Sequence, residues 1–254
     1  MDSLNSSQKG FSLIELMIAL AASLFIIAGL FYSVMGDLRS YESARGTQGI
    51  ASKNRMVAQT FRLYIQQAGF KDLDTLKANQ NYEAATSNAW VWEEGQSLQG
   101  TTSNSYITDE KLGSDILALR FSGTSDSGIV SCDGTNLLTT DVHEMTLYVN
   151  DSNQLMCKDN EQNALLLDED IEFLELLYGT TDNTTRYYTA AEINDWGKVN
   201  RIKVGVLISQ KVVANNHLKN TNSYTIFNKT IAASNDSNFR SVLMDTVLLK
   251  VIKE

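Results

Sequence analysis

The feature that most constrains this chain is a nearly unbroken apolar run from Phe11 to Met35, which a single acidic residue, Glu15, interrupts. A helix needs about 20 apolar residues to cross the hydrocarbon core of a bilayer. The run is long enough for that, and a short polar segment that ends in Lys9-Gly10 precedes it. We therefore predict a membrane-spanning helix near the N-terminus, in which the carboxylate needs an explanation.

Three kinds of segment fit this pattern. A secretory signal peptide would use Ala19-Leu20-Ala21 as its cleavage site, but the apolar run continues well beyond that site and contains a carboxylate. A plain transmembrane anchor would have no use for Glu15, since a carboxylate costs about 2.5–3.5 kcal/mol at the centre of a spanning helix and less near its end. In the third kind, cleavage occurs before the helix, the helix is retained, and the carboxylate has a partner.

The stretch from Lys9 to Leu16, KGFSLIEL, resembles the prepilin processing motif, in which glutamate is the fifth residue after the cut. In that family a membrane-embedded peptidase cuts after the glycine on the cytoplasmic face and methylates the new amino group. The resemblance implies a leader at residues 1–10, cleavage between Gly10 and Phe11, and N-methylation of Phe11. It also implies that residues 11–35 are retained as a transmembrane and filament-core helix.

The position of Glu15 suggests a role in assembly. Cleavage would create a positive amine on Phe11, and methylation would keep that charge. A buried carboxylate is tolerated where an opposite charge pairs with it. Glu15 is therefore expected to neutralise the amine of a neighbouring subunit in a filament, which would also set the axial register. Pairing within one chain stays open, because Phe11 and Glu15 lie one helical turn apart.

Beyond Asp37 the sequence becomes polar but keeps a helical period. Apolar residues recur three or four positions apart as one stripe, and Gly69 follows as a helix-stop signal. The stripe consists of Ile50, Val57, Phe61, Tyr64 and Ala68. We predict a continuous helix from Phe11 to Ala68. Its periplasmic amphipathic half, residues 36–69, would pack on a globular head at residues 70–254, in which residues 70–112 form a loop-rich insertion.

The head is predicted to be rich in β-strands. Several segments alternate apolar and polar residues, and clusters of Gly, Asn, Asp and Ser separate them. The connections are too short for repeated βαβ units, so we predict an α+β fold in which a mainly antiparallel sheet packs on the second half of the helix. The predicted strands cover Asp115–Phe121, Met145–Val149, Ile171–Tyr178, Ile202–Ile208 and Val242–Ile252.

Charge and cysteine content limit the kinds of ligand. A net charge of −9 disfavours binding to nucleic acid, which needs clustered cations. Cys132 and Cys157 would close a loop of moderate length as a disulfide if the head lies outside the cytoplasm, and two unrelated buried thiols are the alternative. Neither belongs to a CxxC pair, and the only histidines are His143 and His217, so we do not expect a structural zinc site.

No motif in the sequence indicates catalysis. His143 begins a predicted strand, His217 lies in an Asn-rich segment, and residues 123–128, GTSDSG, are one residue too long for a nucleophile elbow. Asp168-Glu169-Asp170 could bind calcium, but it lacks the alternating ligands and the glycine of an EF-hand loop, and a solvated acidic turn is the alternative. We therefore expect no catalytic residue, no cofactor and no metal.

The processing motif, the long first helix and several head segments together resemble the PilW family of minor pilins. The helix ends near Gln66–Phe70, and the head segments are Asp115–Phe121, Cys132–Gly134, Leu155–Cys157, Glu172–Gly179, and Trp196 with Val199–Ile208. The resemblance implies a low-abundance subunit that primes pilus assembly at the inner membrane and lies at or near the pilus tip. It implies other minor pilins, the major pilin, the prepilin peptidase and the assembly platform as partners, with a tip adhesin as a further candidate.

The same resemblance places the head in the periplasm before assembly and on the cell surface, within the pilus, afterwards. Two other functions stay open at this point. A minor pseudopilin of a type II secretion system, of the J type, would share the anchor and the sheet. A pilus-borne adhesion module would use exposed aromatic residues, for which Trp90 and Trp92 are the candidates, unless both pack their segment onto the head.

Overall fold

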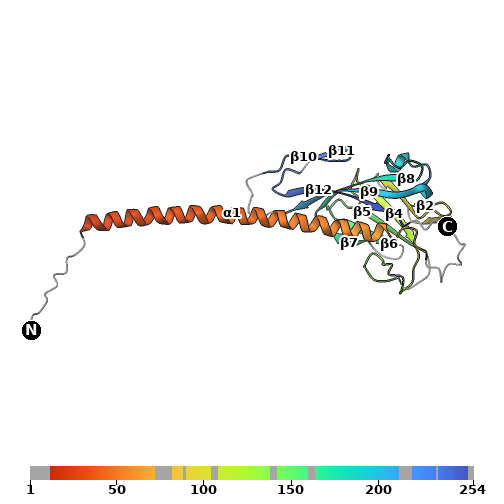
Figure 1. Cartoon of the computed structure of the whole chain (residues 1–254), viewed down its shortest axis with the longest axis horizontal. Helices are drawn as coiled ribbons and strands as arrows, with labels where there is room; N and C mark the ends of the chain where they lie inside the picture. Colours follow the sequence, from red (N-terminus) through yellow and green to blue (C-terminus); the bar gives the residue numbers. More distant parts are fainter. Residues whose placement is uncertain are drawn as a thin grey trace, which may run out of the picture. The chain divides into compact units, whose positions relative to one another are not determined.

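A computed structural model describes residues 12–71, 82–87, 90–103, 108–137, 142–159, 164–211, 219–232 and 234–250 (Figure 1). The chain begins with one long helix, α1 (Leu13–Ile65), and the strands follow it. It divides into two compact units, Met1–Arg45 and Gly46–Glu254. The expected cleavage site between Gly10 and Phe11 lies outside the described residues.

In the first unit, the predicted membrane helix is confirmed as continuous α-helix from Leu13 onward. This is the one helix in the described part of the chain that is long and apolar enough to cross a membrane. Every side chain from residue 13 to residue 35 is exposed. Apolar surface of this extent is stable only in an apolar medium, so the segment needs lipid or other helices around it.

The second unit contains two antiparallel sheets (Figure 1). The larger has the strand order β3-β4-β5-β6-β7 and the smaller has the order β12-β9-β8. Their bounds are β3 (Leu98–Thr102), β4 (Asp115–Phe121), β5 (His143–Val149), β6 (Leu155–Asp159), β7 (Leu165–Asp168), β8 (Ile171–Thr180), β9 (Val199–Gln210) and β12 (Phe239–Leu248). Two hairpins, β1 (Ala85–Ser87) with β2 (Trp90–Trp92) and β10 (Ser223–Ile226) with β11 (Lys229–Ala232), and two 3₁₀ turns, η1 (Ala190–Glu192) and η2 (Trp196–Lys198), complete it.

The five predicted strands are confirmed as β4, β5, β8, β9 and β12, and so is their antiparallel pairing. The prediction of one sheet is wrong, because the strands belong to two. Alternation along a strand shows that one face is buried, but it does not show which sheet the strand joins. The last strand ends at Leu248, and the predicted continuation to Ile252 reaches residues outside the described part of the chain.

The expectation of little regular structure in residues 70–112 is wrong in part, because β1, β2 and β3 all lie there. β3 carries Gly100 and two threonines, so it lacks the apolar alternation of a recognisable strand. Its conformation is set by pairing with the fully buried β4, in a register that places Leu98 opposite Leu119. Non-local pairing of this kind leaves no signal in a short stretch of sequence.

The second half of α1 packs into the head through the predicted stripe. Val57, Phe61, Tyr64 and Ala68 are buried with residues of both sheets in one core, and Ile50 packs at its border. Ile65, which the predicted stripe omitted, is fully buried as well. α1 ends at Ile65, and the chain turns at Gly69, which has a φ of +77° and whose N–H donates to the carbonyl of Arg120 at 2.9 Å.

The two sheets are joined by side chains at the start of β4. Ser114 Oγ donates to the carbonyl of Leu174 at 3.1 Å and accepts from the Leu174 N–H at 3.0 Å. Asp115 Oδ2 accepts from the N–H of Leu176 at 2.7 Å. Leu174 and Leu176 lie on β8 beside the larger sheet. Their backbone groups bond to the side chains of Ser114 and Asp115 instead of to a neighbouring strand. Ser114 and Asp115 therefore join the sheets without a shared strand.

Candidate assembly site

Glu15 lies in the first turn of α1, and its Oε2 accepts a hydrogen bond from the N–H of Ser12 at 3.0 Å. A carboxylate in this position is favoured by the exposed N–H groups and the positive end of the helix dipole. Glu15 is the only acidic or basic residue from Ser12 to Gly36. Leu13 and Leu16 beside it are 75% and 58% exposed, so the carboxylate sits in an apolar surface that the described chain leaves uncovered.

Further along α1, Lys53 ties the helix to the acidic turn between β7 and β8. Its Nζ lies 3.5 Å from Asp168 Oδ1 and 3.2 Å from Asp170 Oδ2. The ammonium thus pairs with both carboxylates, and the described residues contain no group of three or more potential metal ligands. The carboxylates of Asp168 and Asp170 thus pair with the helix, while Glu169 is exposed and the side chain of Asp170 is 45% exposed, as in a solvated acidic turn.

A second set of polar contacts joins α1 to β12. Arg62 donates from Nε and Nη2 to the two carboxylate oxygens of Asp245, at 2.6 and 2.8 Å. The hydrogen bonds from Arg62, together with its charge, lower the pKa of Asp245 below its ordinary value. Asn54 Nδ2 donates to Ser241 Oγ at 2.9 Å, and both residues precede the Arg62–Asp245 pair along their own elements. The sequence did not predict these contacts, because the partners lie far apart along the chain.

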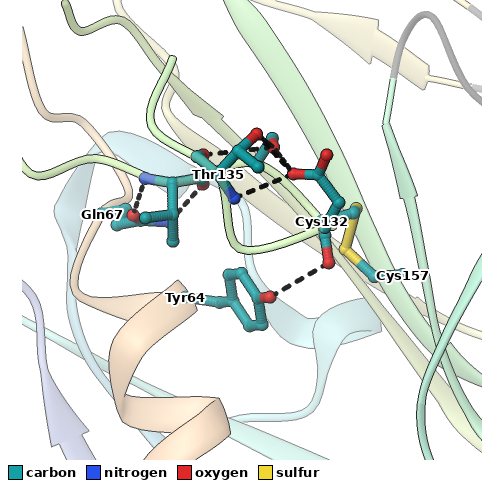
Figure 2. The surroundings of a disulfide bond; sticks show 8 residues. Tyr64, Gln67, Cys132, Thr135 and Cys157 are labelled. Carbon is teal, nitrogen blue, oxygen red and sulfur yellow. Dashed lines mark hydrogen bonds between the residues drawn. A yellow bond between two sulfur atoms is a disulfide. The ribbon is translucent and has the colours of Figure 1, made fainter. Parts of the chain in front are cut away.

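The predicted disulfide is present between Cys132 and Cys157, with Cα atoms 5.6 Å apart (Figure 2). It links the segment between β4 and β5 to β6. The same segment contacts the end of the helix, since Tyr64 donates its hydroxyl to the carbonyl of Cys132 at 3.3 Å. Gln67 Nε2 donates to the carbonyl of Val130 at 3.2 Å, and the Val130 N–H donates back to Gln67 Oε1 at 2.7 Å. The segment is therefore bonded to the helix on one side and to the sheet on the other.

The turn that carries Cys132 is ordered by its neighbour Asp133. One carboxylate oxygen of Asp133 accepts bonds from the hydroxyl of Ser131 and from the hydroxyl and the N–H of Thr135, the last two at 2.7 and 2.9 Å (Figure 2). The bonds from Ser131 and then from Thr135 lower the pKa of Asp133 to about 2. The turn therefore keeps its charge and its hydrogen bonds throughout the physiological pH range.

The other candidate site residues that the structure describes make packing or turn contacts within the head. The ring of His143 stacks on Phe121, with the centroids 6.3 Å apart, and His217 lies outside the described residues. Within GTSDSG, Ser127 Oγ donates to the carbonyl of Thr124 and closes a turn. Trp90 and Trp92 are 4% and 1% exposed and pack against one face of the larger sheet, with Ile116 and Tyr148. Of the two interpretations of these tryptophans, the structure bears out the one in which they pack their segment onto the head.

Two family models match the chain. That of the prokaryotic N-terminal methylation motif matches residues 5–31, and that of PilW, the type IV pilus-assembly protein W, matches residues 137–250. By these two matches the chain is similar to type IV prepilins at its N-terminus and to the PilW-type minor pilins over much of its head. A solved structure, the type IV-like pilin TTHA1219 from Thermus thermophilus, is similar at 15% identity and a TM-score of 0.48, over 79% of this chain and 95% of that one. No curated protein matches the chain in sequence.

The two matched segments contain some of the features described above. The methylation-motif match includes Gly10, Phe11 and Glu15. The PilW match runs from β5 to β12, so it includes Cys157 and the carboxylates that bind the helix, Asp168, Asp170 and Asp245. The helix stripe and the Cys132 turn, by contrast, lie between the two matches.

Removal of the disulfide should destabilise the head without changing its fold. We expect the paired variant Cys132→Ser with Cys157→Ser to lose about 2–4 kcal/mol of unfolding free energy, because the bridge restricts the unfolded chain. Urea unfolding of the full chain in detergent micelles, followed by the fluorescence of the buried tryptophans, measures the difference. Reductant should destabilise the wild-type chain by a similar amount and leave the variant unchanged. Equal stability of variant and wild type would contradict a stabilising role.

Proposed function

We propose that this chain is a minor pilin that primes type IV pilus assembly at the inner membrane and stays at or near the pilus tip. It is made as a precursor, cleaved between Gly10 and Phe11 and methylated on Phe11. The observation that carries the proposal is the exposed apolar half of α1 with Glu15 as its only charge, within a match to the N-terminal methylation motif. A helix of this kind supplies a surface for other helices, and the head supplies specific contacts.

In this proposal Glu15 pairs with the methylated amine of a neighbouring subunit as the helix leaves the lipid. The present bond from Ser12 uses one oxygen of the carboxylate, which can accept several more. An ion pair in an apolar core is far better than two unpaired charges, and leaving one partner unpaired costs about 3–5 kcal/mol. A subunit in the wrong register would therefore be rejected. The partners are other pilins, the prepilin peptidase and the assembly platform, and the head faces the periplasm until assembly.

The role is structural, with no catalytic step. The two family matches are named for pilus assembly and for N-terminal methylation, and neither name describes an enzyme. The alternative of an adhesion module depended on exposed tryptophans, and both Trp90 and Trp92 are buried. The J-type pseudopilin differs from a minor pilin mainly in the filament that it joins, so deletion of the chain separates the two.

Substitution of Glu15 should block incorporation without blocking insertion. We expect Glu15→Gln to leave the chain cleaved and in the membrane, while its amount in sheared pili falls by about tenfold or more, because the neighbouring amine then lacks its counter-charge. Quantitative immunoblots of membrane and sheared fractions measure both. Asp37→Asn is the matched control, since Asp37 is an exposed carboxylate of the same helix beyond the apolar run. Normal incorporation of Glu15→Gln would refute the pairing.

Deletion of the chain tests the priming role. We expect surface filaments to disappear in the deletion strain and to return in part when the retraction motor is also removed, because assembly without a primer is slow but not forbidden. Electron microscopy of surface filaments in both backgrounds gives the count. Unchanged pili together with secreted enzymes retained in the periplasm would instead identify a pseudopilin.

A further inference from the structure

The β10–β11 hairpin covers the outer face of the smaller sheet (Figure 1). Ile226 of the hairpin is fully buried against Leu207 of β9 and Phe173 of β8. Gly205 of β9 makes this approach possible, because a Cβ at that position would collide with Ile226 and lie 2.8 Å from Phe227 Cε2. In the sheet register, Gly205 is the partner of Glu175. The hairpin therefore lies directly over a strand position that carries an acidic side chain.

One lysine of the hairpin reaches two buried carboxylates below it. Lys229 Nζ lies 2.5 Å from Glu175 Oε2 and 3.6 Å from Asp115 Oδ1, and it donates to the carbonyl of Gly113 at 3.1 Å. The side chains of Glu175 and Asp115 are 3% and 6% exposed. Asp115 also accepts from Thr102 Oγ1 at 2.8 Å, besides its bond to β8. Glu175 Oε2 has no further hydrogen-bond donor among the described residues.

This cluster has two acids and one base, so full ionisation leaves a net negative charge in a buried place. Burial raises the pKa of Glu175 to about 7, with Lys229 opposing the rise and the charge of Asp115 adding to it. Burial likewise raises the pKa of Asp115, although its hydrogen bonds and Lys229 lower it. The buried phenol of Tyr178 faces the same two carboxylates, and burial first, then their charges, raise its pKa. The pKa of Glu175 thus lies near neutral pH.

We propose that the β10–β11 hairpin is a pH-sensitive strap, which Lys229 holds on the smaller sheet over Glu175 and Asp115 and which loosens as the pH rises above neutrality. Opening of the strap would hydrate Glu175 and return its pKa to the ordinary carboxylate range. The docked state therefore binds the Glu175 proton more tightly than the open state. The stabilisation of the docked state by this proton is complete below the ordinary carboxylate pKa, and it is lost as the pH rises through about 7.

The strap controls access to apolar surface. Phe173 and Leu207 are buried beneath it, and opening would expose both on the outer face of the sheet. The remaining core is unaffected, because the inner faces of β8 and β9 pack against the helix and the larger sheet. The device is independent of the proposed role in pilus assembly, since it involves neither Glu15 nor the apolar half of α1.

Hydrogen exchange of the full chain in detergent micelles tests the strap. We expect protection factors of the β10 and β11 amides, corrected for intrinsic exchange at each pH, to be about tenfold lower at pH 8 than at pH 6, since about one proton is released over that range. Amides of β8 and β9 serve as the internal reference and should change little. Glu175→Gln should abolish the difference and retain high protection at pH 8. Glu169→Gln, at an exposed carboxylate, should keep it.

A second variant tests the lysine. Lys229→Met should lower hairpin protection at pH 8 more than at pH 6, because Glu175 then ionises without a counter-charge. Equal wild-type protection at the two pH values would overturn the proposal. So would a tenfold difference that persists in Glu175→Gln, or unchanged protection at pH 8 in Lys229→Met.

Discussion

The burial of the last turns of α1 in the head is the interaction on which the rest of the molecule depends. Phe61, Ile65 and Val57 are almost fully enclosed, and each such side chain stabilises the head by about 1.5–3 kcal/mol. The ion pairs beside them contribute less, because Arg62 is 56% exposed and pairs of this kind are worth about 0–1 kcal/mol. Packing therefore holds the helix, and the charged contacts set its orientation against β12 and the β7–β8 turn. The Cys132 segment then closes over the helix end.

A carboxylate in buried or apolar surroundings needs a positive partner, and two places in this chain illustrate the rule. Within the head, Asp115 and Glu175 share Lys229, and Asp115 also bonds the backbone of β8. Glu15, in the apolar half of α1, has only the N–H of Ser12 as a hydrogen-bond partner within the described residues. The same physical rule acts in both places. The head satisfies these acids with its own residues, and for Glu15 we propose the charged amine of a neighbouring subunit.

The sequence predicted the features that depend on local pattern. The apolar run, the stripe from Val57 to Ala68 and five strands with clear alternation were all recognisable, and the disulfide followed from two cysteines in a head expected outside the cytoplasm. The division into two sheets was not predictable, because it rests on Ser114 and Asp115 bonding a strand 60 residues or more away. β3 and the Lys53 contacts were missed for the same reason. Burial of Trp90 and Trp92 depends on which sheet face their hairpin meets, which sequence alone does not specify.

The central claim is that the chain enters a pilus with its apolar helix retained after cleavage in front of Phe11. The most direct measurement is the intact mass of this chain from sheared, purified pili. The account predicts the mass of residues 11–254 with one added methyl group and one disulfide. A chain that still carries the leader, one that begins beyond Ala21, or one that is abundant in the membrane yet absent from pili would contradict it.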